Sequence, residues 1–171
     1  MKKVLIVVDM QEDFVTGSLG SEMAQAIVPN IKNKIKEYED RGDVVLYTQD
    51  THYDHYLETN EGKHLPVKHC IFGTSGWEVV NELNNENYTH VLKETFGYTN
   101  WDLFIDDDVE EIELVGVCTS ICVVSNVLIL KALYPEMNIT VDASCCACVT
   151  PESHKAALET MKMCQVNVIN E

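Results

Sequence analysis

The chain has 171 residues, which is long enough for a substantial apolar core, and we expect a single domain over residues 1–171. Its 28 Asp and Glu residues against 12 Lys and Arg residues give a formal net charge of −16, which repels nucleic acid and anionic membrane surfaces. No apolar run is long enough to span a bilayer, and Lys2 and Lys3 lead straight into a short strand rather than a signal peptide, so we expect no nucleic-acid partner and no membrane partner.

Apolar runs typical of strands then alternate with longer segments typical of helices. In chain order, we expect strands at residues 3–8, 43–48, 88–92, 112–117, 138–142 and 165–169, and helices at about 21–41, 76–84, 119–133 and 151–163. Pro29 predicts a break or a fresh start within the first helical segment, and Gly42 predicts its end. Thr150 and Pro151 are typical of an N-cap and a first helical position. This alternation predicts an α/β fold with three layers (α/β/α): a mostly parallel six-stranded sheet with helices on both faces, as in Rossmann-like proteins.

Three of the predicted strands lead to a chemically reactive side chain. Asp9 directly follows the first strand and Lys93 directly follows the third, while Cys122 lies in the first turn of the helix after the fourth. If these strands are neighbours in one parallel sheet, all three side chains emerge at the same edge. Ligands in open α/β sheets bind at that edge.

An acid, a cation and a thiol at one edge can perform acyl transfer. A single cysteine is often only a small buried apolar side chain, so the accompanying Asp9 and Lys93 are what favour catalysis. A helix N-terminus favours the thiolate of Cys122. Asp9 would take the thiol proton, Lys93 would stabilise the charged state, and backbone N–H groups would hold the oxyanion.

The segment 50–75 is long and polar, and it holds four of the six histidines. Long ordered loops in compact domains are usually functional. Asp50 and His52 form an Asp-x-His pair whose side chains project to the same side, and His69 can return from the far end of the loop. Such ligands suit Zn²⁺, Fe²⁺ or Mn²⁺. On this chemistry alone, a metal site and a polar, solvated loop are equal alternatives.

Seven cysteines are an odd number in a chain without secretory features, which favours reduced thiols and a cytoplasmic location. The spacing of Cys118 and Cys122, and of Cys145, Cys146 and Cys148, does not match the paired knuckles of a structural zinc site. We therefore expect no zinc cluster made of cysteines.

Two segments and Lys93 resemble the cysteine hydrolases of the isochorismatase-like superfamily, and most of all the nicotinamidases. The segments are Asp-Met-Gln-Glu-Asp-Phe at residues 9–14 and Val-Gly-Val-Cys-Thr-Ser-Ile-Cys-Val at residues 115–123. Their order and spacing agree with the superfamily over nearly the whole chain. The resemblance implies the isochorismatase-like hydrolase fold and a catalytic triad of Asp9, Lys93 and Cys122.

The resemblance also implies roles around this triad. Phe14 matches a position that lines the substrate pocket. A cis peptide bond is implied between Val117 and Cys118, and it would turn the Cys118 N–H, together with the Cys122 N–H, toward the oxyanion.

Asp50, His52 and His69 match the residues that bind a divalent metal in nicotinamidases. The fourth ligand varies in that family; Glu61 is the first choice here, His55 the second and His64 the third. We expect one divalent ion, with Zn²⁺ as the first choice and iron or manganese as alternatives. In such enzymes the metal binds the pyridine nitrogen and orients the substrate.

The implied function is a metal-dependent amidase of NAD salvage, which hydrolyses nicotinamide to nicotinate and ammonia through a cysteine thioester. One alternative is a metal-free or differently selective cysteine hydrolase of the superfamily, acting on another small amide or on isochorismate. Another is a non-catalytic binding protein with the same fold. The expected partner is a small-molecule amide, and a homo-oligomer remains open.

Overall fold

The computed structural model describes residues 2–171. Six parallel strands form one sheet in the order β3-β2-β1-β4-β5-β6. The strands are β1 (Lys2–Val8), β2 (Val44–Asp50), β3 (Thr89–Lys93), β4 (Val109–Val117), β5 (Asn138–Ala147) and β6 (Asn167–Ile169). The chain crosses from one side of β1 to the other after β3, so the topological switch point lies beside β1.

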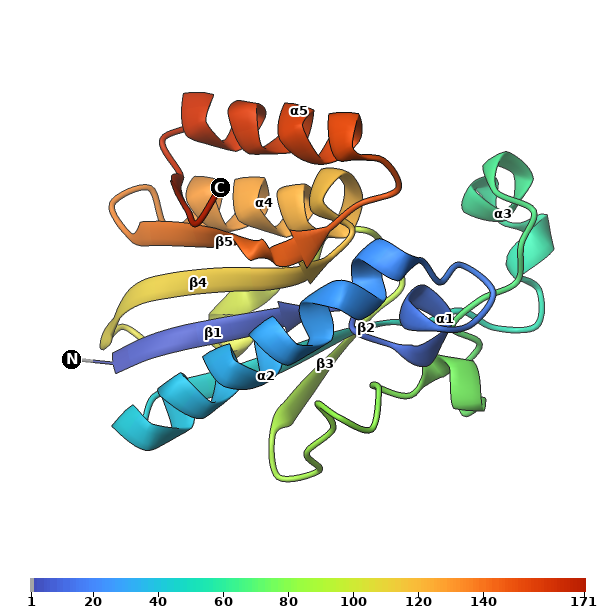
Figure 1. Ribbon diagram of the computed structural model, residues 1–171, viewed down its shortest axis with the longest axis horizontal. Helices are drawn as coiled ribbons and strands as arrows, with labels where there is room; N and C mark the ends of the chain where they lie inside the picture. The colour runs from blue at the N-terminus through green and yellow to red at the C-terminus, as the bar shows by residue number, and fades with distance from the viewer. Residues whose placement is uncertain (1) are drawn as a thin grey trace.

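Helices cover both faces of this sheet (Figure 1). The helices are α1 (Glu12–Val15), α2 (Glu22–Arg41), α3 (Asn60–His64), α4 (Val124–Leu133) and α5 (Pro151–Met163). Of these, α2, α4 and α5 cover the faces, whereas α1 and α3 lie at the carboxyl ends of the strands. The long helix α2 packs on one face through a buried stripe that includes Ile27, Ile31 and Ile35. The helices α4 and α5 cover the opposite face through Leu130 and Leu158 among others. The predicted three-layer α/β/α fold with a parallel six-stranded sheet is therefore confirmed.

The caps predicted from sequence are present. Gly42 ends α2 in the left-handed conformation, with φ of 75°, where a side chain would be strained. Thr150 caps α5 by accepting from the Ser153 N–H, and Pro151 occupies the first helical position.

Two local predictions were wrong. Helix α2 runs unbroken through Pro29, because the buried stripe on its inner side outweighs the lost backbone hydrogen bond of about 3 kcal/mol. No helix occupies residues 78–84. Val79 instead pairs antiparallel with Gln11, and the Val80 N–H donates to the Met10 carbonyl at 3.0 Å. These apolar residues have helical spacing, but they enter the core from an irregular segment.

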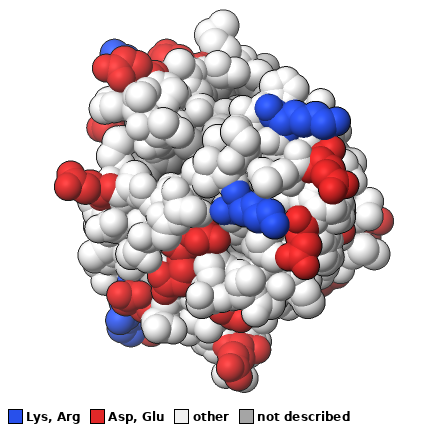
Figure 2. Space-filling model, turned by 90° about the vertical axis from the view of Figure 1, so that its right-hand side faces the viewer, with Lys and Arg blue, Asp and Glu red and all other residues white. Residues whose placement is uncertain are grey.

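None of the helices within residues 2–171 is long and apolar enough to cross a membrane. The face at the carboxyl ends of the strands, where α1 and α3 lie, carries acidic side chains spread around its edge (Figure 2). Its basic side chains stand apart from one another. This surface supports the expectation that nucleic acid is not a partner, which stays a prediction.

Candidate active site

The structure brings Asp9, Lys93 and Cys122 together at the carboxyl ends of three strands. The Lys93 Nζ lies 2.7 Å from Asp9 Oδ2 and 3.6 Å from Cys122 Sγ. All three residues are buried, with at most 5% of their surface exposed. The lysine therefore contacts both the acid and the thiol, and the three side chains lie together as predicted from the positions of the strand ends.

Local backbone geometry delivers two of these side chains. Asp9 leaves β1 with φ of 50°, and its Oδ1 accepts a 2.6 Å hydrogen bond from the Thr48 hydroxyl on β2. Cys122 lies in a π-helical segment, Thr119–Val123, that precedes α4, rather than in an ordinary first α-helical turn. Such π-helical insertions often occur at functional sites. The two elements thus aim a carboxylate and a thiol at the same lysine.

Burial governs the electrostatics of this triad. Burial raises the pKa of the Cys122 thiol well above its ordinary value, and the neighbouring Asp9 carboxylate raises it further, while Lys93 opposes both. Burial also raises the pKa of Asp9, and this effect outweighs the ion pair with Lys93, which lowers it. For Lys93, burial lowers the pKa, but the negative charge of Asp9, together with that of Asp50, outweighs this effect and holds the ammonium protonated.

The prediction that the helix N-terminus favours a thiolate at Cys122 was therefore wrong. Burial beside a carboxylate destabilises the thiolate more than a helix N-terminus stabilises it, so Cys122 rests as a thiol. The Asp9 carboxylate contacts the same lysine as Cys122, so it is placed to take the thiol proton.

The triad reaches a pocket of about 640 Å³ through Cys122. Phe14, Cys118 and Cys122 line it, together with the apolar side chains Leu65 and Phe96. The peptide bond between Val117 and Cys118 is cis, as the resemblance implied. His69 also lines the pocket, 5.4 Å from Phe14 between ring centroids, so the pocket reaches from the thiol to this histidine.

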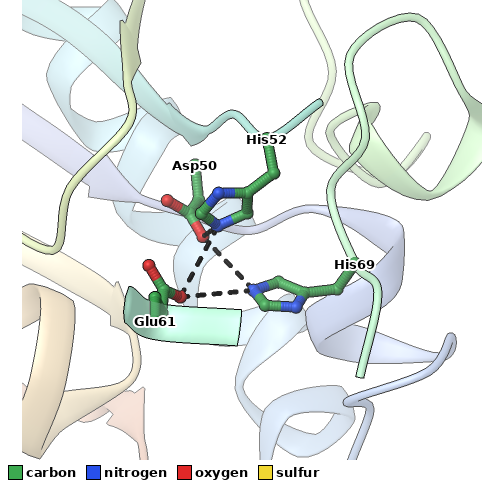
Figure 3. Close-up of side chains that lie close together, drawn as sticks. All are labelled: Asp50, His52, Glu61 and His69. Atoms are coloured by element: carbon green, nitrogen blue, oxygen red, sulfur yellow. Dashed lines mark hydrogen bonds and ion pairs between the residues drawn. The ribbon is translucent and has the colours of Figure 1, made fainter. Parts of the chain in front are cut away.

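Four side chains beside the triad form a cluster with metal-ligand chemistry. Asp50, His52, Glu61 and His69 each offer one ligand atom, and these atoms all lie within 4.8 Å of one another. They point toward a common centre, with Glu61 coming from α3 (Figure 3). The shortest approach is 2.9 Å, between His52 Nε2 and Asp50 Oδ2. Two imidazoles and two carboxylates suit zinc or a similar divalent ion.

Two features of the carboxylates in this cluster fit a bound cation. Asp50 Oδ1 is fully buried without a hydrogen-bond partner, and the nearest cation to it is Lys93 Nζ at 3.6 Å. Burial and the charge of Asp50 raise the pKa of Glu61, so a negative charge is opposed there. A bound divalent cation would relieve both conditions.

The structure separates the three candidates for the fourth ligand. Glu61 Oε1 lies 3.6 Å from His52 Nε2 and 3.8 Å from His69 Nε2. His55 stacks on Tyr53 at the surface, and His64 is exposed with its Nδ1 against the Asn60 carbonyl. Glu61 is the candidate that the fold brings to the cluster.

Sequence reasoning assigned no role to two polar residues of segment 9–14. The Gln11 side chain donates to the Asp50 carbonyl and accepts from the Asp50 N–H, both at 2.8 Å, so it fixes the end of β2. The Asp13 carboxylate accepts from the Cys70 N–H at 2.8 Å, next to His69. Both residues stand in the segment that carried the resemblance, which was the signal available for them.

Asn126 was also missed. Its side chain is fully buried and contacts three backbone groups: it accepts from the Tyr98 N–H at 2.8 Å, and it donates to the Cys122 carbonyl at 2.8 Å and to the Phe96 carbonyl at 3.3 Å. It joins the segment after Lys93 to the segment that carries Cys122. An asparagine within an apolar helix was the only sequence sign of this position.

The comparisons with known proteins agree with this geometry. Residues 3–171 match the model of the isochorismatase domain. The chain is 30% identical to a protein of Arabidopsis thaliana described as a probable inactive nicotinamidase, with 92% of this chain and 87% of the relative covered. It is also 30% identical to an uncharacterized isochorismatase family protein, PncA, of Bacillus subtilis, with 92% and 93% covered.

Among solved structures, the pyrazinamidase of Pyrococcus horikoshii in complex with zinc superposes with a TM-score of 0.86 at 25% identity. The match covers 100% of both chains. The similarity therefore extends over the sheet, the helices and the loops that hold the candidate site.

Proposed function

This chain belongs to the isochorismatase family, and from that membership we propose that it is a metal-dependent amidase that hydrolyses nicotinamide to nicotinate and ammonia. The observation that carries the proposal is that two groups of side chains meet at one pocket, which Cys122 lines for the first group and Asp50, Glu61 and His69 line for the second. One is the triad Asp9, Lys93 and Cys122, and the other is the cluster around Asp50. The pyrazinamidase that binds zinc has the same fold over its full length, which supports the amidase class.

In this mechanism Cys122 is the nucleophile and Asp9 carries the proton. Asp9 takes the thiol proton as Sγ attacks the carboxamide carbon, and it then gives that proton to the departing ammonia. A water molecule, deprotonated by the same carboxylate, hydrolyses the thioester and frees the thiol. Since the pKa of Cys122 is raised, the proton transfer belongs to the chemical step rather than to the resting enzyme.

Lys93 stabilises the negative charge during the proton transfer between Cys122 and Asp9. Its ammonium contacts both Asp9 and Cys122, so it stabilises the negative charge whether that charge resides on oxygen or on sulfur. The N–H groups of Cys118 and Cys122 are the proposed donors to the oxyanion of the tetrahedral intermediate.

A metal fits beside the triad, and Asp50, His52, Glu61 and His69 would hold it. When bound, the ion would supply a positive centre that binds the ring nitrogen of the substrate. Phe14 lies against His69 and provides an apolar wall for the ring.

The test compares kcat/KM for nicotinamide with kcat/KM for benzamide, which has no ring nitrogen. We expect a preference of at least about a hundredfold for nicotinamide, because a site built for a polar contact leaves its buried partner unsatisfied with the analogue. Cys122→Ala should abolish turnover, while Cys164→Ala, at an exposed thiol, should leave it unchanged. Equal values for the two amides would refute the anchoring role of the ring nitrogen.

A second candidate is an amidase of the same family with another small amide as its substrate. It is favoured by the pocket wall, where the segment before His69 reads Leu65-Pro66-Val67 and carries no aromatic ring. Leu65 lines the pocket and is 40% exposed. Hydrolysis of larger ring amides in preference to nicotinamide would select this candidate. The non-catalytic alternative predicts no turnover of any amide, and the complete triad argues against it.

A further inference from the structure

Two cysteines that the proposed mechanism does not use as nucleophiles meet in the wall of the pocket. Cys118 and Cys148 are 30 residues apart in the chain, and their Sγ atoms lie 2.6 Å apart. Both are free thiols. The gap exceeds the length of a disulfide bond by only about 0.6 Å. The carboxyl ends of β4 and β5 bring them together, since Cys118 follows β4 and Cys148 follows β5.

Hydroxyl groups surround one of these sulfurs. The Ser120 Oγ lies 2.9 Å from Cys148 Sγ, and the Ser153 hydroxyl donates to the same sulfur at 3.3 Å. Ser153 belongs to the first turn of α5, whose N-terminus favours a negative charge. In the same run of sequence, Cys145 has only the more distant Ser144 hydroxyl, at 3.9 Å, and burial raises the pKa of the Cys145 and Cys146 thiols.

The two thiols differ in acidity. Burial opposes the Cys148 thiolate, but hydrogen bonds from Cys118, Ser120 and Ser153 outweigh it and lower the pKa of Cys148 to about 7. Burial and the contact with Cys148 raise the pKa of Cys118 to about 12. Near neutral pH, Cys148 is therefore the more acidic thiol and is partly ionised, while Cys118 stays protonated, which is the pattern of an attacking and a resolving cysteine.

We propose that Cys118 and Cys148 form a redox-active pair that a hydroperoxide oxidises to a disulfide in the wall of the pocket. Both residues line the 640 Å³ pocket, so a small oxidant reaches them from the same opening as the substrate. This inference goes beyond the amidase activity and does not depend on it.

The reaction balances with the hydroperoxide as the only oxidant. The Cys148 thiolate attacks the nearer peroxide oxygen and breaks the O–O bond, which gives a sulfenic acid and releases an alkoxide, or hydroxide from hydrogen peroxide, that then takes a proton. The Cys118 sulfur then attacks the sulfenic sulfur and forms the S–S bond, and its proton leaves with the hydroxyl group as water. Two thiols lose two electrons, and one peroxide gains them.

The Cys118 thiol becomes easier to deprotonate after the first step. Part of the rise in its pKa comes from the charge and hydrogen bond of Cys148, and both vanish when Cys148 becomes a sulfenic acid. The disulfide would then tie the turn before Cys122 to the segment that leads into α5. It would also remove the Cys148 thiolate from the pocket wall.

The experiment maps disulfides in the full chain after treatment with hydrogen peroxide. Trypsin places Cys118 and Cys122 in one peptide, residues 94–131, and Cys145, Cys146 and Cys148 in another, residues 132–155. The Cys122→Ala protein is therefore used, so that the first peptide holds a single cysteine. After equimolar peroxide and blocking of free thiols, we expect the two peptides to be joined, with fragment ions that assign the bond to Cys148. Dithiothreitol should separate them.

Matched variants in the Cys122→Ala background sharpen the result. Cys148→Ala should lose the linked peptides, whereas Cys145→Ala should keep them. Circular dichroism shows whether each variant is folded, and the fragment-ion assignment stands even if Cys148→Ala is not. A bond to Cys145 or Cys146 would overturn the proposal. The proposal would also be overturned if Cys148 stopped at sulfenic or sulfinic acid without forming the disulfide. It would equally be overturned if Cys148 were oxidised no faster than the exposed Cys164.

Discussion

The hydrogen bonds of Asn126 make a quantitative prediction for Asn126→Ala. The substitution removes three contacts and leaves the Tyr98 N–H without its acceptor, while the Phe96 and Cys122 carbonyls each lose a donor. An unsatisfied buried polar group costs about 1–3 kcal/mol, and the better helix propensity of alanine returns at most about 0.7 kcal/mol. We therefore expect the free energy of unfolding to fall by about 2–4 kcal/mol.

Urea unfolding followed by tryptophan fluorescence measures this loss, since Trp101 packs against Tyr98 with ring centroids 5.3 Å apart. The urea midpoint should fall while the dependence on urea concentration stays the same. Asn33→Ala, at an exposed position of α2, is the matched control and should change stability by no more than about 0.5 kcal/mol. A loss below about 0.5 kcal/mol for Asn126→Ala would refute the view that these three contacts hold the two segments together.

Three further predictions follow from the site and its support. Chelation should remove the amidase activity, and added zinc should restore it. Glu61→Gln should weaken zinc binding by at least about tenfold, measured in competition with a chromophoric chelator. An unchanged zinc affinity would show that Glu61 is not a ligand. Burial raises the pKa of Asp142, but hydrogen bonds from Ser144 and Lys34 outweigh this effect and lower the pKa below its usual value. The ionised carboxylate therefore stabilises the fold above about pH 4. This stabilisation is lost as the pH falls through the lowered pKa. Urea midpoints measured below pH 4 should therefore fall less steeply for Asp142→Asn than for the unaltered protein, and parallel curves would count against this linkage. Gly116 has φ of 117°, and a Cβ there would lie 2.1 Å from the Val8 carbonyl oxygen. Gly116→Ala should therefore lower the free energy of unfolding by at least about 3 kcal/mol in the same urea assay. A near-normal urea midpoint would show that β1 and β4 can move apart to accept the methyl group.

The strands and the triad were predictable because they rest on local patterns. A continuous apolar run that ends in a polar residue identifies a buried parallel strand, and parallel strands share one edge. These patterns identified Asp9 and Lys93 in the sequence, and the structure places their charged atoms 2.7 Å apart. The start of α5 was predictable for a similar reason, since Thr150 and Pro151 act within one turn of chain.

The features that were missed depend on contacts between distant segments. Val79 and Val80 have helical spacing, but their backbone pairs with the segment around Gln11, which no local pattern records. The acidity of Cys122 was misjudged because it depends on complete burial beside Asp9. The role of Asn126 likewise requires the segment near Tyr98 to be in place. In each case the deciding partner lies far away in the sequence.

The ammonium of Lys93 links the two halves of the candidate site. It lies 2.7 Å from Asp9 Oδ2 and 3.6 Å from Asp50 Oδ1, so one cation serves two carboxylates. With Cys122 as a thiol, these three charges sum to minus one in a buried site, and Glu61 adds to the deficit when it is ionised. A divalent ion among Asp50, Glu61 and the two histidines would offset that charge and leave Lys93 free to stabilise the exchange between Asp9 and Cys122. A metal bound there would thus support the triad electrostatically, in addition to any contact it made with the substrate.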